Sequence, residues 1–140
     1  AVAERWVTEH PDTEFDFFLP PYSILFWDKV IREGRTEAVF AAIRQAGQTL
    51  LQYDNVKFYG YLMDPEIVTN LDNYCDYIHH SGGVCREILA MLQREEGRLT
   101  EENLEETLAN WREFVVHYDY DQFWDERFWI QWNAEHAAAP

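Results

Sequence analysis

The chain has 140 residues, of which 47% are hydrophobic and 16% aromatic, and this fits one domain with a real core. Aspartate and glutamate number 26 against 11 lysines and arginines, which gives a formal net charge of −15. Because phosphate binding depends on Lys and Arg, this charge argues against nucleic acid and against an anionic membrane surface as partners. No apolar run is long enough to span a bilayer, and no signal-peptide pattern is present.

The first 21 residues predict an irregular arm, because Pro11 breaks any early helix. The alternation of Phe15, Asp16 and Phe17 fits a short extended piece. A sheet needs partner strands, and none is visible in the pattern. We therefore expect residues 1–21 to form an arm that packs along helices.

From Tyr22 onward, apolar residues recur at helical spacing. Gly34 predicts a helix end, Thr36 a helix start, and Asp64-Pro65 a further start, whereas residues 56–63 predict a short helix or turn. The first three expected helices cover residues 22–33, 36–50 and 65–78. The next carries Ile88 to Leu92 and ends near Gly97, another is capped by Thr100 and carries Leu104 to Val115, and the last covers residues 121–135. The fold class predicted is all-α, with six or seven short helices in a single domain over 22–136 and a loose tail over 137–140.

Two helix pairs also resemble each other at a spacing of fifty residues. Glu37 matches Glu87 and Gly47 matches Gly97, with Val39 opposite Leu89. A true repeat predicts helical hairpins stacked as a short degenerate array, and a chance match in any helical protein remains the alternative.

The run Tyr22-Ser23-Ile24-Leu25, followed by Gly34-Arg35, Glu37-Ala38 and Gly47, resembles one pentatricopeptide-type helical hairpin. Residues 74–97 resemble a second, more divergent hairpin. Pentatricopeptide arrays bind single-stranded RNA, and the net charge argues against that here. The chain is similar, in size and helical character, to the small euglenozoan-specific accessory subunits of the mitochondrial F-type ATP synthase.

That resemblance implies a non-catalytic role on the catalytic head of the synthase, and a location in the mitochondrial matrix. The first residue is Ala1 rather than Met, which fits either a removed presequence or a trimmed chain. The resemblance implies no particular binding residues.

Candidate metal ligands occur around Cys75 and His79, whose spacing of four would place both on one side of a helix. His80, Cys85 or His117 could complete the ligand set of a zinc site, but the spacing of these residues matches no strong zinc pattern. We therefore expect no metal site, no cofactor and two reduced thiols.

Acidic residues gather near the C-terminus, among them Asp119, Asp121, Asp125 and Glu126. A calcium loop would need a central glycine, which is missing, and any acidic helix offers a carboxylate pair. Ser23 and Ser81 do not lie in a nucleophile-elbow context. The sequence therefore predicts no enzyme activity and no catalytic residues.

Aromatic residues near the C-terminus give the best candidate for function, because they cover more than one face of a helix, and interfaces draw their strongest anchors from Trp and Tyr. Burial all round a central helix is the alternative. The partner-binding residues predicted are Phe15, Phe17, Phe18, Tyr120, Trp124, Phe128, Trp129 and Trp132.

Three hypotheses follow for function. The first is a non-catalytic subunit that docks on a larger protein assembly, suspected to be the ATP synthase, through aromatic anchors in an acidic surface. The second is an acidic inhibitor that mimics DNA and occupies a nucleic-acid-binding protein, which requires carboxylates in rows on one rigid face. The third is a small hydrolase or metal enzyme, which requires a concave site with perturbed acids or Cys and His ligands.

Overall fold

The computed structural model describes residues 2–136, without the side chains of Trp132, Glu135 and His136. The expected tail over 137–140 lies outside these residues. The elements in chain order are α1 (Val2–Glu9), β1 (Phe15–Phe18), α2 (Ile24–Arg32), α3 (Thr36–Leu50), β2 (Val56–Tyr59), the 3-10 turn η1 (Tyr61–Met63), α4 (Pro65–Val68), η2 (Leu71–Asn73), α5 (Gly82–Gln93), β3 (Arg98–Leu99), α6 (Leu104–His117), η3 (Asp121–Trp124) and α7 (Glu126–His136).

Within residues 2–136, three strands form one mixed sheet in the order β1-β2-β3. β1 pairs with β2 in parallel, with Phe15 opposite Val56, and β3 pairs with β2 antiparallel, with Phe58 opposite Leu99. The helices α2 and α3 form the crossover between the two parallel strands, as a parallel pair requires. The prediction of an all-α fold is therefore wrong, and the chain has a mixed α/β fold.

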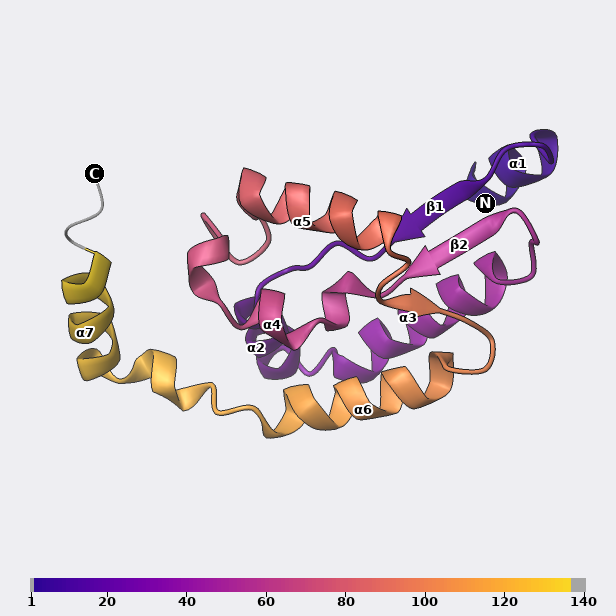
Figure 1. Cartoon of the computed structure of the whole chain (residues 1–140). Helices are drawn as coiled ribbons and strands as arrows, with labels where there is room; N and C mark the ends of the chain where they lie inside the picture. The colour runs from indigo at the N-terminus through magenta and orange to yellow at the C-terminus, as the bar shows by residue number, and fades with distance from the viewer. Residues whose placement is uncertain (1, 137–140) are drawn as a thin grey trace.

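The sheet is the middle of three layers (Figure 1). α5 covers one face, and α3 and α6 lie across the other. The alternation of side chains along β2 divides the core in the same way, because Phe58 belongs to a cluster with Trp27, Phe40 and Trp111, whereas Tyr59 packs with Ile88 from α5.

Two stretches account for the wrong fold class. The arm expected over residues 1–21 contains α1 and β1, and the segment expected to be a short helix or turn contains β2. Each of the two parallel strands has four residues, and their partners lie about forty positions apart in sequence. No local period in the sequence reports such a pairing.

The helix expected over 65–78 is also shorter than predicted. It ends at Val68, and the residues that follow form η2 and an irregular loop from Tyr74 to His80, closed by a bridge between these two residues. Ser81-Gly82-Gly83, read as a helix stop, instead begins α5, with Ser81 as its N-cap. Cys75 and His79 therefore do not share a helix face.

The prediction of stacked helical hairpins is wrong as well. The two matched glycines, Gly47 and Gly97, occupy their positions for different physical reasons. Gly47 lies in α3 where an added Cβ would come 2.8 Å from Leu104 Cδ2 of α6. Gly97 follows α5 with a φ of +70°, which favours glycine. Their spacing of fifty residues does not mark a repeat.

Candidate active site

The predicted partner-binding residues lie in two separate places. In β1, Phe15 and Phe17 are half-buried against the core with their rings stacked at 6.1 Å, and Phe18 is exposed beside Tyr61. Tyr120 is buried in the core. The rest belong to η3 and α7.

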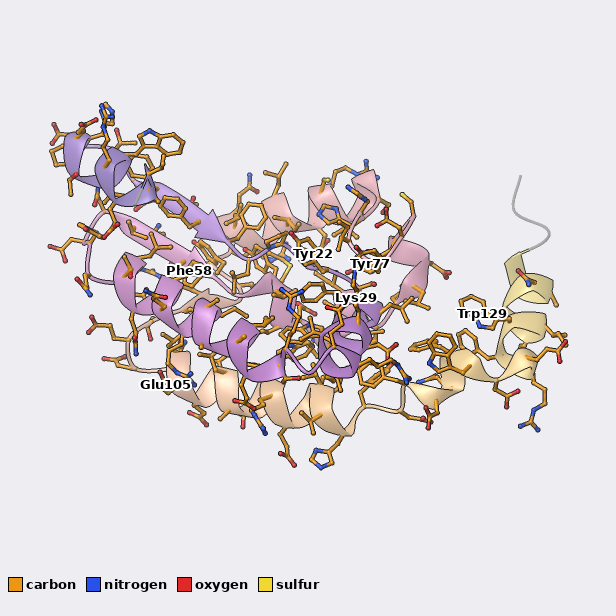
Figure 2. All side chains as sticks on the ribbon, turned by 180° about the vertical axis from the view of Figure 1, so that it is seen from behind. Tyr22, Lys29, Phe58, Tyr77, Glu105 and Trp129 are labelled. Carbon is orange, nitrogen blue, oxygen red and sulfur yellow. The ribbon has the colours of Figure 1, made fainter. Side chains whose placement is uncertain are left out.

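η3 and α7 form an arm that projects from the body (Figures 1 and 2). Phe123 is buried in the core cluster and Phe128 packs against it, with the two rings in a T-shaped contact at 5.2 Å. Trp124 is 69% exposed and lies under the guanidinium of Arg32 at 5.2 Å. Trp129 is partly exposed and donates Nε1–H to the carbonyl of Phe123 at 2.6 Å. Trp132 lies in α7, and its side chain is not among those described.

A carboxylate–imidazole pair lies in the loop that follows α4 and η2. Asp76 Oδ2 is 2.6 Å from Nδ1 of His79. The other oxygen, Asp76 Oδ1, accepts the backbone N–H groups of Ile78 at 2.8 Å and His79 at 2.7 Å. These bonds, led by the one to the imidazole, lower the pKa of Asp76 to about 2. The carboxylate is therefore ionised at neutral pH and held in one orientation.

The loop that carries this pair is bonded to the chain that leaves β1. The carbonyl of Tyr77 accepts both the backbone N–H of Ser23 at 3.1 Å and its hydroxyl at 2.9 Å. The hydroxyl of Tyr74 donates to the carbonyl of Pro21 at 2.8 Å. Burial raises the pKa of the Tyr74 phenol, so that it stays a donor. The loop is thus fixed at the side of the sheet to which β1 and β2 both point.

The remaining zinc candidates do not assemble around His79. Cys85, in the first turns of α5, has its Sγ 3.6 Å from Nδ1 of His80. Cys75 bonds the carbonyl of His79 only through its backbone N–H. His117 ends α6 and lies near Glu113. Among residues 2–136, no group of three His, Cys, Asp or Glu side chains has the arrangement of a metal site.

A hollow of about 300 Å³ adjoins the pair, because Tyr77 and Ile78, the two residues between Asp76 and His79, contribute to its wall. Its apolar wall also includes Tyr22 and Phe26 from the start of the α2 region and Val39 of α3. Three charged residues, Lys29, Glu33 and Arg35, complete the lining. Figure 2 shows Tyr22, Lys29 and Tyr77 gathered in one region of the surface.

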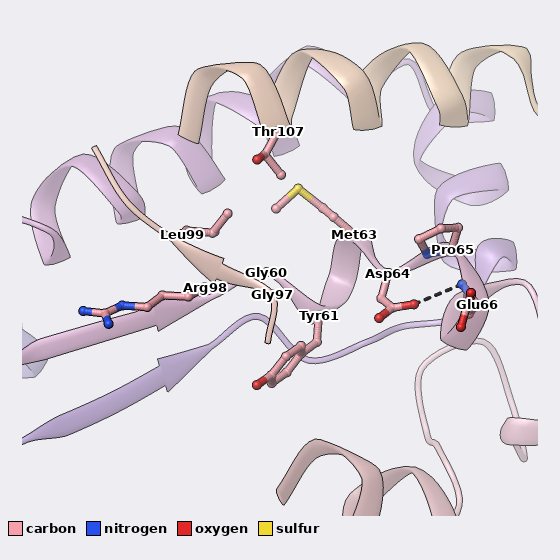
Figure 3. A pocket seen from close by; sticks show the side chains of 10 residues that line it. All are labelled: Gly60, Tyr61, Met63, Asp64, Pro65, Glu66, Gly97, Arg98, Leu99 and Thr107. Atoms are coloured by element: carbon pink, nitrogen blue, oxygen red, sulfur yellow. Dashed lines mark hydrogen bonds between the residues drawn. The ribbon is translucent and has the colours of Figure 1, made fainter. Parts of the chain in front are cut away.

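A second hollow, of about 370 Å³, lies between β3, η1 and α6 (Figure 3). Its acid Asp64 is occupied as the N-cap of α4, accepting the backbone N–H groups of Glu66 and Ile67. Tyr61 lines it with a hydroxyl that is buried without a partner in the described residues, and burial raises the pKa of Tyr61 to about 12. This hollow offers no oriented base, so it is the weaker candidate for chemistry.

Sequence reasoning missed the pairing of Asp76 with His79. It named His79 only as a metal candidate on a helix, and it did not name Asp76. The spacing of three residues was visible, but an Asp and a His three apart occur by chance in any acidic chain. Only the loop conformation turns the carboxylate back onto the imidazole.

No helix among the described residues is long and apolar enough to cross a membrane. The resemblances to pentatricopeptide arrays and to the ATP synthase subunits are wrong, because the chain has a mixed sheet and its similar proteins are of another kind. The location in the mitochondrial matrix depended on that resemblance and stays an untested prediction.

The comparisons point elsewhere. The chain is similar to two curated proteins described as UPF0735 ACT domain-containing protein, one from Lacticaseibacillus casei and one from Lacticaseibacillus paracasei. Each is 24% identical over 90 residues, which cover 64% of this chain and 62% of the relative. The chain thus spans less than two thirds of the length of these relatives. No family model and no solved structure gave a significant match.

Proposed function

We propose that this chain supplies the base of a hydrolytic active site that cleaves an ester or related acyl bond, with His79 as general base and Asp76 as the group that orients it. The observation that carries this proposal is the 2.6 Å contact between Asp76 Oδ2 and His79 Nδ1. In such sites a base activates the nucleophile, and a third group orients the base. His79 can be the base here, and Asp76 is placed to orient it.

The carboxylate determines which imidazole nitrogen carries the proton. An ionised carboxylate only accepts hydrogen bonds, so Nδ1 of His79 must be the donor in the neutral ring. The lone pair is then on Nε2, and the side chain of His79 is 72% exposed. The imidazole is thus prepared to accept a proton from a group that approaches from solvent.

The place of the pair in the fold supports the same proposal. In open α/β sheets, ligands bind outside the carboxyl ends of the strands. The chain leaving β2 leads to the loop of Asp76 and His79. Hydrogen bonds from Ser23 and Tyr74 join this loop to the chain leaving β1. A rigid base at this edge is in the position from which α/β enzymes act.

The described residues hold no nucleophile bonded to His79. Ser23 is fully buried and donates to Tyr77, Ser81 caps α5, and Cys85 lies beside His80. The proposal therefore takes water as the nucleophile, activated directly by Nε2 of His79.

The reaction balances with one water. The water oxygen bonds to the acyl carbon while one of its protons passes to Nε2 of His79, and the bond to the alcohol oxygen breaks. That oxygen leaves with the proton from Nε2, which gives the alcohol and the free acid. Asp76 stays ionised throughout and stabilises the imidazolium.

The test compares His79→Ala with the matched control His80→Ala in the 140-residue chain. Hydrolysis of p-nitrophenyl acetate is measured. We expect His79→Ala to lower the rate by roughly 10²- to 10⁴-fold, and His80→Ala to retain it. Equal rates in both variants, or no hydrolysis by the parent protein, would contradict the proposal.

A second candidate function is the binding of a basic protein through the arm of η3 and α7. The exposed fractions favour it, since Trp124 is 69% and Ile130 62% exposed on a segment that also carries Asp121, Asp125 and Glu126. Aromatic anchors inside a ring of carboxylates suit a basic partner.

The acids of the body do not form rows on one face. Glu9, Glu37, Glu87 and Glu105 each pair with an arginine, and they lie on α1, α3, α5 and α6. This arrangement disfavours the DNA-mimic alternative. Partner binding is tested by co-purification with the Trp124→Ala and Ile130→Ala variants, with Leu89→Ala, an exposed apolar residue of α5, as control. Only the variants in the arm are expected to lose the partner.

A further inference from the structure

The hollow beside His79 differs in charge from the rest of this acidic chain. Its lining includes two cations, Lys29 and Arg35, and one carboxylate, that of Glu33. Glu33 is 4.0 Å from Lys29 Nζ and 3.2 Å from Arg35 Nη1, so one carboxylate is shared by two cations. The other nearby acids are engaged elsewhere, because Asp28 pairs with Arg32 and Asp76 with His79. The rim therefore has an excess of positive charge in a chain of net charge −15.

The wall of the hollow is apolar and aromatic. Tyr22 and Phe26 have their ring centroids 5.0 Å apart, and Tyr77 presents its ring beneath Lys29 Nζ, 5.0 Å from the centroid. Val30 and Val39 close the wall from α2 and α3. A volume of about 300 Å³ is at the small end of ligand sites, which fits one ring or a short alkyl chain.

The hollow is also built on fixed elements. Tyr77 is held by the two bonds from Ser23 to its carbonyl, and Val30 is buried in the core. Lys29 is restrained both by Glu33 and by the ring of Tyr77. A site of this kind loses little entropy when a ligand enters it.

From these observations we propose that the hollow binds an apolar group that ends in an anion, and that this group is part of the ester acted on at His79. The second half of this inference rests on the proposed function. The apolar part lies against Tyr22, Phe26 and Tyr77, and the anionic end meets Lys29 and Arg35. Ile78, which lines the hollow, is the chain neighbour of His79, so the proposal requires the ester carbonyl to extend from the hollow past Ile78 toward the imidazole.

The charge pattern decides between an anionic and a neutral group. A neutral ring would gain only a weak cation–π contact from the two cations. A carboxylate replaces part of the water around them and forms charge-assisted hydrogen bonds. A cationic group would meet repulsion from Lys29 and Arg35 and only one carboxylate. The substrate class is therefore an ester whose apolar portion carries a carboxylate.

The 140-residue chain is titrated with 4-phenylbutyrate and with the neutral 4-phenylbutanamide, and binding is followed by NMR shifts of backbone amides. We expect saturable shifts confined to residues that line the hollow, and an affinity about tenfold higher for the carboxylate than for the amide. Lys29→Gln should bring the two affinities together, and Val39→Trp should abolish both by filling the hollow. Arg44→Gln, on the far part of α3, is the matched control and should bind like the parent chain.

The His79→Ala variant separates the two proposals. It should bind 4-phenylbutyrate like the parent chain, because binding does not need the base, whereas ester hydrolysis should be lost. Equal affinity for acid and amide, shifts outside the hollow, or unchanged binding by Val39→Trp would overturn the inference whatever the hydrolysis rates are. Failure of the proposed function appears only in the rates of the His79 and His80 variants.

Discussion

At the scale of single residues, the candidate site depends on a few side chains in an irregular loop. Asp76 and His79 are three residues apart, and the backbone N–H groups of Ile78 and His79 turn the carboxylate of Asp76 toward the imidazole. These bonds join residues within the loop, so they form only if the loop conformation is fixed. Hydrogen bonds of Ser23 and Tyr74 fix the loop against the chain that leaves β1.

The pH dependence of stability should report the Asp76 contact. Its pKa falls from 3.8 to about 2 in the folded chain, mainly because of the bond to His79, so its contribution is present above about pH 4 and is lost as the pH falls toward 2. We expect the difference in Tm between the parent chain and Asp76→Asn to shrink over that window. Asp54→Asn, at an exposed turn, is the control, and an equal pH profile for both variants would contradict the expectation.

Asp76 should also determine the tautomer of His79. In the neutral ring, the carboxylate requires the proton on Nδ1. Nitrogen-15 shifts of the imidazole should therefore show Nδ1–H in the parent chain and a mixture of tautomers in Asp76→Ala. A ring protonated on Nε2 in the parent chain would remove the basis for a general-base role.

At the scale of elements, α1 is held against the body by Val7, which is buried in the core, and by the amide side chain of Asn55. Asn55 Nδ2 lies 3.3, 3.2 and 3.0 Å from the carbonyls of Val7, His10 and Thr13. Asn55→Ala removes these bonds and should lower the free energy of unfolding by about 1–3 kcal/mol. Amide exchange in residues 2–14 should rise, while exchange in α3 and α6 should not. Equal amide exchange rates for residues 2–14 in the parent chain and in Asn55→Ala would show that Asn55 does not anchor α1.

The close approach of α3 and α6 is another property of the elements. An added Cβ at Gly47 would lie 2.8 Å from Leu104 Cδ2 and 3.5 Å from Phe58 Cε1. Gly47→Leu should destabilise the chain by about 1–3 kcal/mol or more, because the two helices must separate. Ala42→Leu, on the exposed side of α3, is the control, and denaturant unfolding measures both. Equal midpoints would show that α3 and α6 tolerate the larger side chain.

At the scale of the whole molecule, the arm of η3 and α7 is joined to the body at few places. Arg32 bonds Asp28 at 2.7 Å, lies 3.8 Å from Asp121 and covers Trp124. These contacts are partly exposed, so each contributes little to stability. We expect Arg32→Ala to raise amide exchange in residues 121–136 with a change of less than about 1 kcal/mol in global stability. Lys29→Ala, which touches the hollow but not the arm, should leave exchange in the arm unchanged.

Several features of this protein follow from the sequence alone, because they depend on neighbouring residues. Gly34, with a φ of +66°, follows α2, Thr36 begins α3, and Asp64 caps the helix that Pro65 begins, as predicted. The acidic charge is a property of composition and needs no fold. Helix signals repeat within one or two turns, which is why they can be read locally.

Tertiary structure alone decided the fold class and the candidate site. β1 and β2 have four residues each and pair across two helices. The alternation of Phe15, Asp16 and Phe17 therefore predicts an extended piece but not its partner, and β2 carries no period long enough to be recognised. Asp76 and His79 meet because bonds from the chain after β1 hold their loop. Parallel pairing and loop anchoring join residues dozens of positions apart, and a pattern within ten residues contains no information about such contacts.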